Sequence, residues 1–188
     1  MVRVVIAGDG PLAAALADWY HQAGANVTEL SFNRELEPQA LAVAGGIDLL
    51  VVADSFEPEP GSVHSIDRDA LGASLFRLTF LPFRVAALLQ PELVAVNGRA
   101  VLLSRSDARM DLPDGVGRYL ERPFRSASHA LWRCLSIEWR DAGVSVGLIA
   151  AGSGATPSIA ALTDAIGNRD ESRFPVELTD ISGNIVGW

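Results

Sequence analysis

The sequence contains no lysine, because all 15 of its basic residues are arginine. No side chain of this protein can therefore form a Schiff base, act as an amine base or hold a phosphate as the lysine of a P-loop does. Arginine cannot take over the role of a base, since its guanidinium stays protonated at any physiological pH. The composition thus excludes reactions that depend on a lysine amine.

Cysteine is almost absent as well, with Cys134 as its only example. A single thiol can form neither an internal disulfide nor a cysteine-based zinc site. It lies in an apolar helix-like stretch, so we expect a buried thiol. The three histidines, His21, His64 and His129, do not have the spacing of metal ligands. We therefore expect no metal site.

Long apolar runs are also missing. No uninterrupted run reaches the roughly 18 residues that a bilayer-spanning helix needs, and Met1-Val2-Arg3 leads straight into a strand-like segment rather than a signal peptide. The net charge of −8 and the pI near 4.8 argue against nucleic acid as a partner. The sequence thus predicts a cytoplasmic location, with no nucleic-acid and no membrane partner.

What the chain does have is an alternation of β-branched segments with helix-like segments, typical of a parallel sheet covered by helices. The expected strands are residues 2–7, 26–32, 47–53, 100–104, 144–150 and 184–186. The expected helices are residues 11–24, 35–43, 67–89, 124–141 and 158–166. No repeat or linker interrupts this order, so residues 1–188 are predicted to form one domain.

The first strand ends in a turn with the order Gly-x-Gly-x-x-Ala, which is typical of a dinucleotide-binding loop. Gly8 and Gly10 would permit the tight turn, and Ala13 the close packing of the helix. Against this reading, Asp9 would place a carboxylate where phosphates bind, and Pro11 removes one N–H donor from the helix start. The sequence therefore favours a protein without a cofactor, with NAD(P) as the alternative.

Residues farther along complete the candidate cofactor site. Arg34, just after the second strand, could meet a 2′-phosphate, and Glu29 is the acidic alternative for a ribose hydroxyl. Asp54 follows the third strand and is the remaining candidate. The alternative for each of these residues is that its charged side chain is simply exposed to solvent and binds no ligand.

Several segments, taken in order, resemble the short-chain dehydrogenase/reductase family. They are Ala23-Gly24-Ala25-Asn26-Val27, residues 47–53, Pro82-Phe83, residues 98–104, residues 142–146, residues 151–156 and residues 182–186. The resemblance implies a three-layer, Rossmann-like α/β fold with a doubly wound parallel sheet. About 15 residues separate the second strand from Ile47, where the family has a helix, a strand and another helix. We therefore expect about six strands, one βα unit fewer than usual.

The same resemblance identifies the positions of the family's catalytic residues. Its members use a tyrosine as proton donor, a lysine four residues later, a serine on the preceding strand and an asparagine in a long helix. Alignment without gaps places Glu121 at the tyrosine, Arg125 at the lysine, Arg105 at the serine and Leu78 at the asparagine. The chain is thus similar to a shortened, degenerate member that lacks the Tyr-x-x-x-Lys pair.

A second alignment is compatible with a catalytically active protein. Ser106 and Tyr119 are 13 residues apart, the spacing that the family uses between serine and tyrosine, and Arg122 and Arg125 follow. A Ser-Tyr-Arg set resembles the halohydrin dehalogenases, although their arginine lies four residues after the tyrosine, where this chain has Pro123. The alternative function is therefore an NAD(P)-dependent oxidoreductase, or a nucleotide-free lyase of the dehalogenase kind.

Two long helices carry more apolar surface than one sheet can cover. Residues 71–89 are apolar on more than one face, and Trp132 and Trp139 form a second stripe on the helix 124–141. In the resembled family, these two helices form a four-helix bundle across a two-fold axis. We expect a homodimer, or a heteromer with a catalytically intact relative, through residues 67–89 and 124–141. The leading hypothesis is a non-catalytic structural or regulatory subunit; a small-molecule binding module at the strand ends is a third possibility.

Overall fold

The computed structural model describes residues 1–53, 55–58, 61–62, 64–105, 118–151, 158–167 and 176–186. Six strands form one sheet in the order β2-β1-β3-β4-β5-β6. Their bounds are β1 Arg3–Ala7, β2 Asn26–Leu30, β3 Leu49–Val52, β4 Arg99–Ser104, β5 Ser145–Ala150 and β6 Thr179–Asp180. Neighbouring strands are parallel throughout, and Val5 of β1 lies between Thr28 of β2 and Leu50 of β3.

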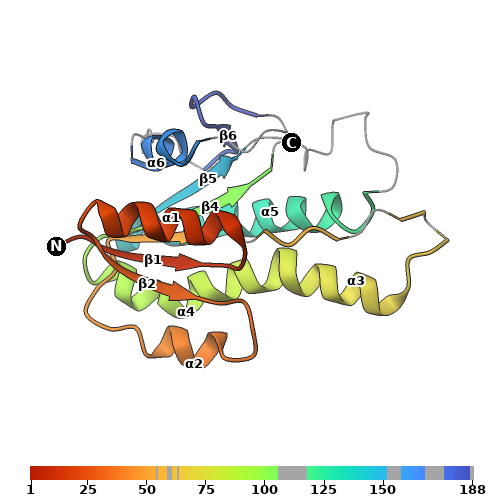
Figure 1. Ribbon diagram of the computed structural model, residues 1–188, viewed down its shortest axis with the longest axis horizontal. Coiled ribbons are helices and arrows are strands. Elements are labelled where there is room, and N and C mark those ends of the chain that lie inside the picture. The colour runs from red at the N-terminus through yellow and green to blue at the C-terminus, as the bar shows by residue number, and fades with distance from the viewer. Residues whose placement is uncertain are drawn as a thin grey trace.

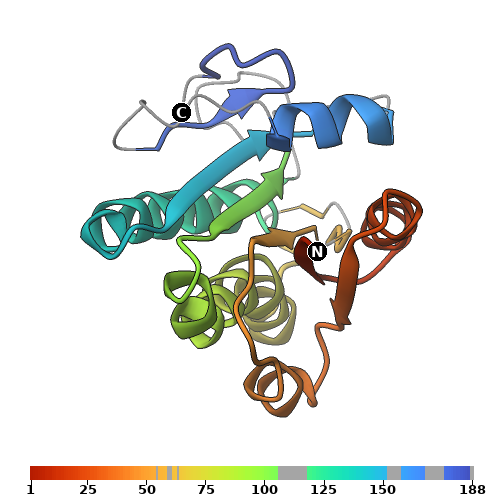
Figure 2. The same ribbon diagram turned by 90° about the vertical axis from the view of Figure 1, so that its left-hand side faces the viewer.

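Helices cover both faces of this sheet, so the predicted three-layer, doubly wound fold is confirmed (Figure 2). Helices α1 (Pro11–Gln22) and α6 (Ile159–Gly167) lie on one face, while α2 (Leu36–Leu41), α4 (Leu81–Val94) and α5 (Arg122–Glu138) lie on the other. The six-residue α2 is the only element between β2 and β3, in a stretch that is described throughout. The sheet is therefore one βα unit shorter, as expected.

Alternation along each strand divides the core into two layers. Val4 and Ile6 of β1 pack toward α1 and α6, whereas Val5 and Ala7 pack toward α2, α4 and α5. These strands are apolar on both faces because a doubly covered parallel sheet is buried on both sides. Each fully buried aliphatic side chain contributes on the order of 1.5–3 kcal/mol, so the two layers together hold the carboxyl ends of the strands in place.

A single long helix runs from Arg68 to Val94 and changes its winding in the middle. It begins as α3 (Arg68–Leu75), which Asp67 caps by accepting a hydrogen bond from the Ala70 amide. It continues as the π-helical turn η1 (Phe76–Phe80) and then as α4. The sequence predicted one helix that ends at Leu89. The wide turn lies just before Pro82, a place where helices commonly bend.

The helix Arg68–Val94 has the length, and over an 18-residue window the mean hydropathy of 1.4, that a membrane span requires. Arg77 and Arg84 interrupt it, so it contains no apolar run of that length. Val85, Ala86 and Leu89 of its second half are fully buried against the sheet, whereas only 39% of the 18-residue window is buried in all. The absence of a membrane partner stays a prediction.

Helix α5 is turned differently from the expected orientation. Trp132 and Trp139 were predicted to form an outward stripe, but they are 0% and 1% exposed and pack in the core. Cys134 lies between them and is exposed, so the prediction of a buried thiol is wrong. The expected helix 124–141 ends as an α-helix at Glu138 and continues as a short 3₁₀ turn, Arg140–Ala142.

The last strand was also misplaced. The sequence predicted residues 184–186, whereas the strand that joins the sheet is Thr179–Asp180, parallel to β5. Ile185 makes only an isolated antiparallel bridge to Thr179. The chain therefore enters the sheet five residues earlier, turns at Gly183 and comes back along the same strand.

Candidate functional site

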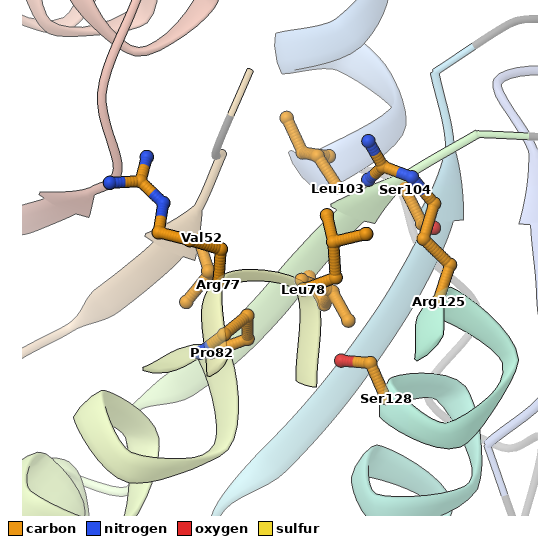
Figure 3. A pocket seen from close by; sticks show the side chains of 9 residues that line it. Val52, Arg77, Leu78, Pro82, Leu103, Ser104, Arg125 and Ser128 are labelled. Atoms are coloured by element: carbon orange, nitrogen blue, oxygen red, sulfur yellow. The ribbon is translucent and has the colours of Figure 1, made fainter. Parts of the chain in front are cut away.

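The carboxyl ends of β1, β3 and β4 face the starts of α1 and α5 and the turn η1, the edge at which open α/β sheets bind ligands. A small, partly open cleft lies there (Figure 3). Its apolar lining comes from Val52, Leu78, Pro82, Leu102 and Leu103. Its polar lining comes from Arg77, Ser104, Arg125 and Ser128. The site therefore combines an apolar floor with two hydroxyls and two guanidinium groups.

Ser104 is the last residue of β4, and its hydroxyl meets the imidazole of His129 from α5. The Oγ–Nε2 distance is 2.6 Å, and both residues are buried. Burial, together with the positive charge of Arg125 one turn earlier, lowers the pKa of His129 to about 4. The imidazole is therefore neutral at pH 7.

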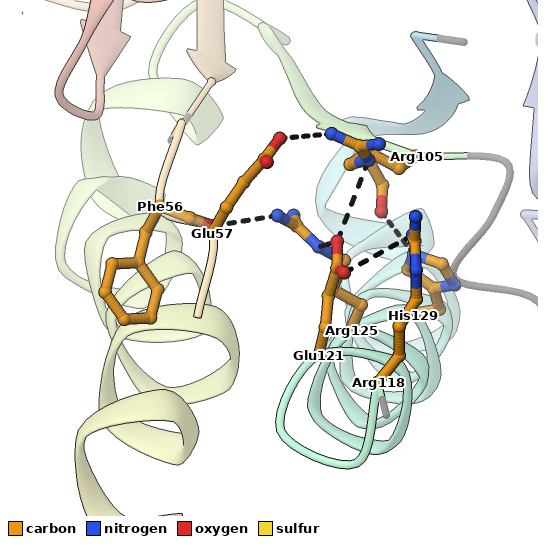
Figure 4. A network of polar contacts seen from close by, with 8 residues as sticks. Phe56, Glu57, Arg105, Arg118, Glu121, Arg125 and His129 are labelled. Atoms are coloured by element: carbon orange, nitrogen blue, oxygen red, sulfur yellow. Dashed lines mark hydrogen bonds and ion pairs between the residues drawn. The ribbon is translucent and has the colours of Figure 1, made fainter. Parts of the chain in front are cut away.

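Glu121 and Arg125 form a buried ion pair at the start of α5 (Figure 4). The Nε atom of Arg125 donates to Oε1 of Glu121 at 3.1 Å. Two further arginines approach the same carboxylate, with Nε of Arg105 at 3.7 Å and Nη1 of Arg118 at 3.5 Å. The positions that alignment assigned to tyrosine and lysine are thus filled by a carboxylate and a guanidinium that hold each other.

A short segment after β3, residues 55–58, crosses this edge of the sheet and is tied down at both ends. The Ser55 amide donates to the Asp9 carbonyl at 3.1 Å. The Phe56 carbonyl accepts from Nη2 of Arg125 at 2.9 Å, and Glu57 forms an ion pair with Arg105 (Figure 4). The chain itself therefore bridges from the turn after β1 to the start of α5.

The aspartate of the glycine-rich turn is paired with an arginine of η1. Oδ2 of Asp9 lies 3.1 Å from Nη1 of Arg77, and Oδ1 accepts from the Phe32 amide at 3.2 Å. Arg77 also donates to the Phe32 carbonyl at 2.9 Å. Its guanidinium lies 5.8 Å and 5.3 Å from the ring centres of Phe32 and Phe56. Asp9 is thereby fixed beside the start of α1.

A dinucleotide pyrophosphate at this turn would need the N–H groups at the start of α1. Gly8 and Gly10 have the positive φ angles of 142° and 99° that suit a glycine turn. Beside Gly10, however, the space is filled, because a Cβ built there would lie 2.7 Å from Cβ of Ser55. The carboxylate of Asp9 adds a repulsive charge at the same helix end. Ala13 is buried in the core beneath the turn.

Two further cofactor candidates, Glu29 on β2 and Arg34 just after it, are exposed. Arg34 makes no hydrogen bond or ion pair within the described part of the chain. Asp54 lies outside the described residues. None of these observations tests whether the protein binds NAD(P), so the expected absence of a cofactor stays a prediction.

The Ser106–Tyr119–Arg arrangement is only partly described. Ser106 lies outside the described residues. Tyr119 is 45% exposed and does not line the cleft. Arg125 lines the cleft but is directed to Glu121, and Arg122 is half-buried on the first turn of α5. This set of catalytic residues therefore stays a prediction.

Sequence reasoning missed His129 and Ser128 as members of the site. Glu121, Arg125 and His129 follow one another at intervals of four residues, so they share one face of α5. That spacing is the signal that could have placed His129 beside the cleft. Ser128 has no such signal, because its place depends on how α5 is rotated against β4.

Comparison with known proteins establishes the fold. No protein-family model matches the chain, and no curated protein is similar to it in sequence. A solved structure of a Burkholderia multivorans protein named as a short-chain dehydrogenase/reductase, with bound NADP, is similar with a TM-score of 0.80 at 17% identity, over 100% of this chain and 99% of that chain. A carbonyl reductase from Pseudomonas aeruginosa PAO1 in complex with NADP is similar with a TM-score of 0.83 at 19% identity, over 100% of both chains.

A third solved structure, described as a dehalogenation enzyme, is similar with a TM-score of 0.68 at 16% identity. The match covers 79% of this chain and 71% of that chain. Sequence identities this low support a shared fold, but they do not support a shared activity, substrate or cofactor. The chain therefore has the fold of the short-chain dehydrogenases/reductases, as its sequence pattern predicted.

Proposed function

We propose that this protein is a non-catalytic molecule with the short-chain dehydrogenase/reductase fold, acting as a structural or regulatory subunit. The observation that carries the proposal is the buried pair of Glu121 and Arg125. The carboxylate of Glu121 is engaged by guanidinium groups, and the guanidinium of Arg125 does not release its proton, so these two positions lack the phenol and the amine that pass a proton in the resembled family. The absence of lysine removes the usual amine as well.

The proposal also holds that the protein works without a dinucleotide. Its support is the turn after β1, where Asp9 pairs with Arg77 and Ser55 lies against Gly10. A pyrophosphate arriving there would have to displace the chain's own contacts and approach a carboxylate. NADH and NADPH are therefore expected to leave the melting temperature unchanged, since only a ligand of the folded state raises it.

Assembly through the long helix is the second part of the proposal. Leu71, Leu75, Phe76 and Phe80 are 44–50% exposed, and the rings of Phe76 and Phe80 stack at 5.4 Å. Helix α3 extends past the carboxyl ends of the strands (Figure 1). An exposed apolar face of this kind favours a partner helix. On α5, Ile137 and Cys134 face outward in place of the two tryptophans.

The oligomeric state tests the assembly. Sedimentation velocity of the intact chain is expected to show a dimer, and Leu75→Asp is expected to shift it to a monomer with unchanged circular dichroism. Leu41→Asp is the matched control, because Leu41 is 69% exposed but lies on α2, away from the long helix face. A monomeric wild-type protein at tens of micromolar would overturn homodimerisation. Co-purification from the native host would then identify a heteromeric partner or exclude one.

An enzyme is the alternative, and the observation that favours it is the fold shared with NADP-bound structures. In that case, the protein would be an oxidoreductase, or a dehalogenase-like lyase, that uses Ser106, Tyr119 and a nearby arginine. Reduction of a panel of carbonyl compounds with NADPH, at ordinary enzymatic rates, would establish this alternative. Tyr119→Phe would then abolish the activity, whereas it is without effect under our proposal.

A further inference from the structure

The hydroxyl of Ser128 is buried in the wall of the cleft without a hydrogen-bond partner among the described residues. The residue is 2% exposed, and its side chain is directed into the cleft (Figure 3). A buried hydroxyl without a partner is costly, so each one needs an explanation. An unfilled ligand position is one such explanation.

The local structure shows why this hydroxyl is unpaired. A serine inside a helix usually donates to the carbonyl four residues earlier, as Thr163 does to Ile159 at 3.0 Å. For Ser128, that carbonyl belongs to Phe124, and it accepts a 2.7 Å hydrogen bond from Thr79 of η1. The contact between the π-helical turn and α5 therefore occupies the acceptor that Ser128 would otherwise use.

Arg125 lines the same cleft three residues earlier and has donors to spare. Its two hydrogen bonds within the described residues use Nε, toward Glu121, and Nη2, toward the Phe56 carbonyl. This leaves Nη1 available to a ligand. Glu121 offsets the charge of Arg125 only in part, because Arg105 and Arg118 approach the same carboxylate. An anionic group near Nη1 would therefore be stabilised.

Apolar side chains lie between and around these polar groups. Leu78, Val52 and Leu102 line the cleft, and their surfaces suit a short carbon chain rather than a bare inorganic ion. The Ser104 hydroxyl is already engaged by His129, so Ser128 is the hydroxyl of the cleft that still needs a partner. A fitting ligand is small, negatively charged at one end and oxygen-bearing farther in.

We propose that this cleft binds a short carboxylic acid that carries a second oxygen, as a hydroxyl or oxo group. Its carboxylate meets Arg125, its carbon chain lies against Leu78, and its second oxygen accepts a hydrogen bond from Ser128. The site needs no dinucleotide and no proton transfer. It is therefore independent of whether the protein is catalytic or dimeric.

The test compares matched acids with the full-length protein, free of nucleotide, by isothermal titration calorimetry and saturation-transfer NMR. 3-Hydroxybutyrate is expected to bind about tenfold more tightly than butyrate, because only the former satisfies Ser128. Methyl 3-hydroxybutyrate, which lacks the carboxylate, is expected not to bind. In Ser128→Ala, the ratio of the two acids should fall to about one.

Ser126→Ala, on the same helix but outside the cleft lining, is the control and should keep the tenfold preference. Circular dichroism and urea unfolding confirm that both variants are folded. Absence of saturable binding by any acid in the series would overturn the proposal. So would binding that does not distinguish the two acids, or a preference that survives in Ser128→Ala. A reductase activity of the protein would overturn the proposed function but would leave this result unaffected.

Discussion

The Oγ atom of Ser104 lies 2.6 Å from Nε2 of His129, which joins the end of β4 to the second turn of α5. The contact lies beside the cleft, because Ser104 and Ser128, the neighbour of His129, both line it. The imidazole in this contact is neutral, since burial and Arg125 both disfavour its charged form.

Acid should therefore destabilise the protein through His129. Its pKa is about 4 in the folded state and 6.5 in the unfolded state, so the unfolded state binds more protons between these values. The free energy of unfolding is then fully present above pH 6.5 and falls as the pH decreases toward 4. Between pH 7.5 and pH 5, we expect this group to cost about 2 kcal/mol.

Urea unfolding at these two pH values measures the effect. His129→Gln should remove about that much of the pH dependence, while His21→Gln, at an exposed position, should leave it unchanged. An equal pH dependence in wild type and His129→Gln would contradict the prediction.

The pair of Glu121 and Arg125 should show strong energetic coupling. Glu121→Gln leaves the charge of Arg125 buried without its carboxylate, which typically costs about 3–5 kcal/mol. Arg125→Gln should cost less, because Arg105 and Arg118 still approach Glu121. The double variant should cost clearly less than the sum, in a double-mutant cycle followed by urea unfolding. Glu37 and Arg84 form the comparison pair at 2.7 Å on the surface, where we expect little or no coupling. Additive effects at Glu121 and Arg125 would show that the two charges do not stabilise each other.

Trp132 should act on stability rather than on assembly. Trp132→Ala removes a fully buried side chain and should lower the free energy of unfolding by roughly 3–5 kcal/mol. Ile137→Ala, at a residue that is 53% exposed on the same helix, should cost well under this amount. Chemical denaturation measures both. A Trp132→Ala protein that unfolds like wild type but changes its sedimentation coefficient would place the tryptophan in an interface instead.

Replacement by alanine should change the free energy of unfolding in opposite directions at two glycines. Gly10→Ala places a Cβ against Ser55 at a φ of 99°, and we expect a loss on the order of 1–3 kcal/mol. Gly72→Ala, in α3 with nothing within 4 Å of the new Cβ, should stabilise the protein by about 0.5–1 kcal/mol. Thermal unfolding of the two variants measures both changes in stability. Unchanged stability in Gly10→Ala would mean that the turn relaxes, and that the space beside it is not closed.

Much of the fold could be predicted from the sequence because it follows from local residue patterns. Largely apolar runs such as residues 47–53, which follow Gly45 and Gly46, indicate buried parallel strands. The missing βα unit was a matter of counting residues before Ile47. The last strand was missed because Thr179–Asp180 is too short and too polar to show a pattern, and its pairing with β5 depends on the rest of the sheet.

The rotation of each helix about its own axis was harder to predict from the sequence. An amphipathic pattern gives the apolar residues of a helix but not which of two apolar stripes meets the sheet. Trp132 and Cys134 therefore exchanged their predicted environments. The π-helical turn at Phe76–Phe80 rotates the first half of the long helix relative to the second. Neither rotation follows from propensity.

The sequence by itself determined that no lysine is available to tune a tyrosine, and that a parallel α/β sheet would form, because composition and short-range periodicity do not depend on the remaining fold. Only the tertiary structure decided that Asp9 pairs with Arg77, that Ser104 pairs with His129 and that Ser128 pairs with nothing among the described residues. These partners are separated by 25 residues or more, or are lost to a competing contact. Their pairing is set by how helices pack on the sheet, which no local pattern records.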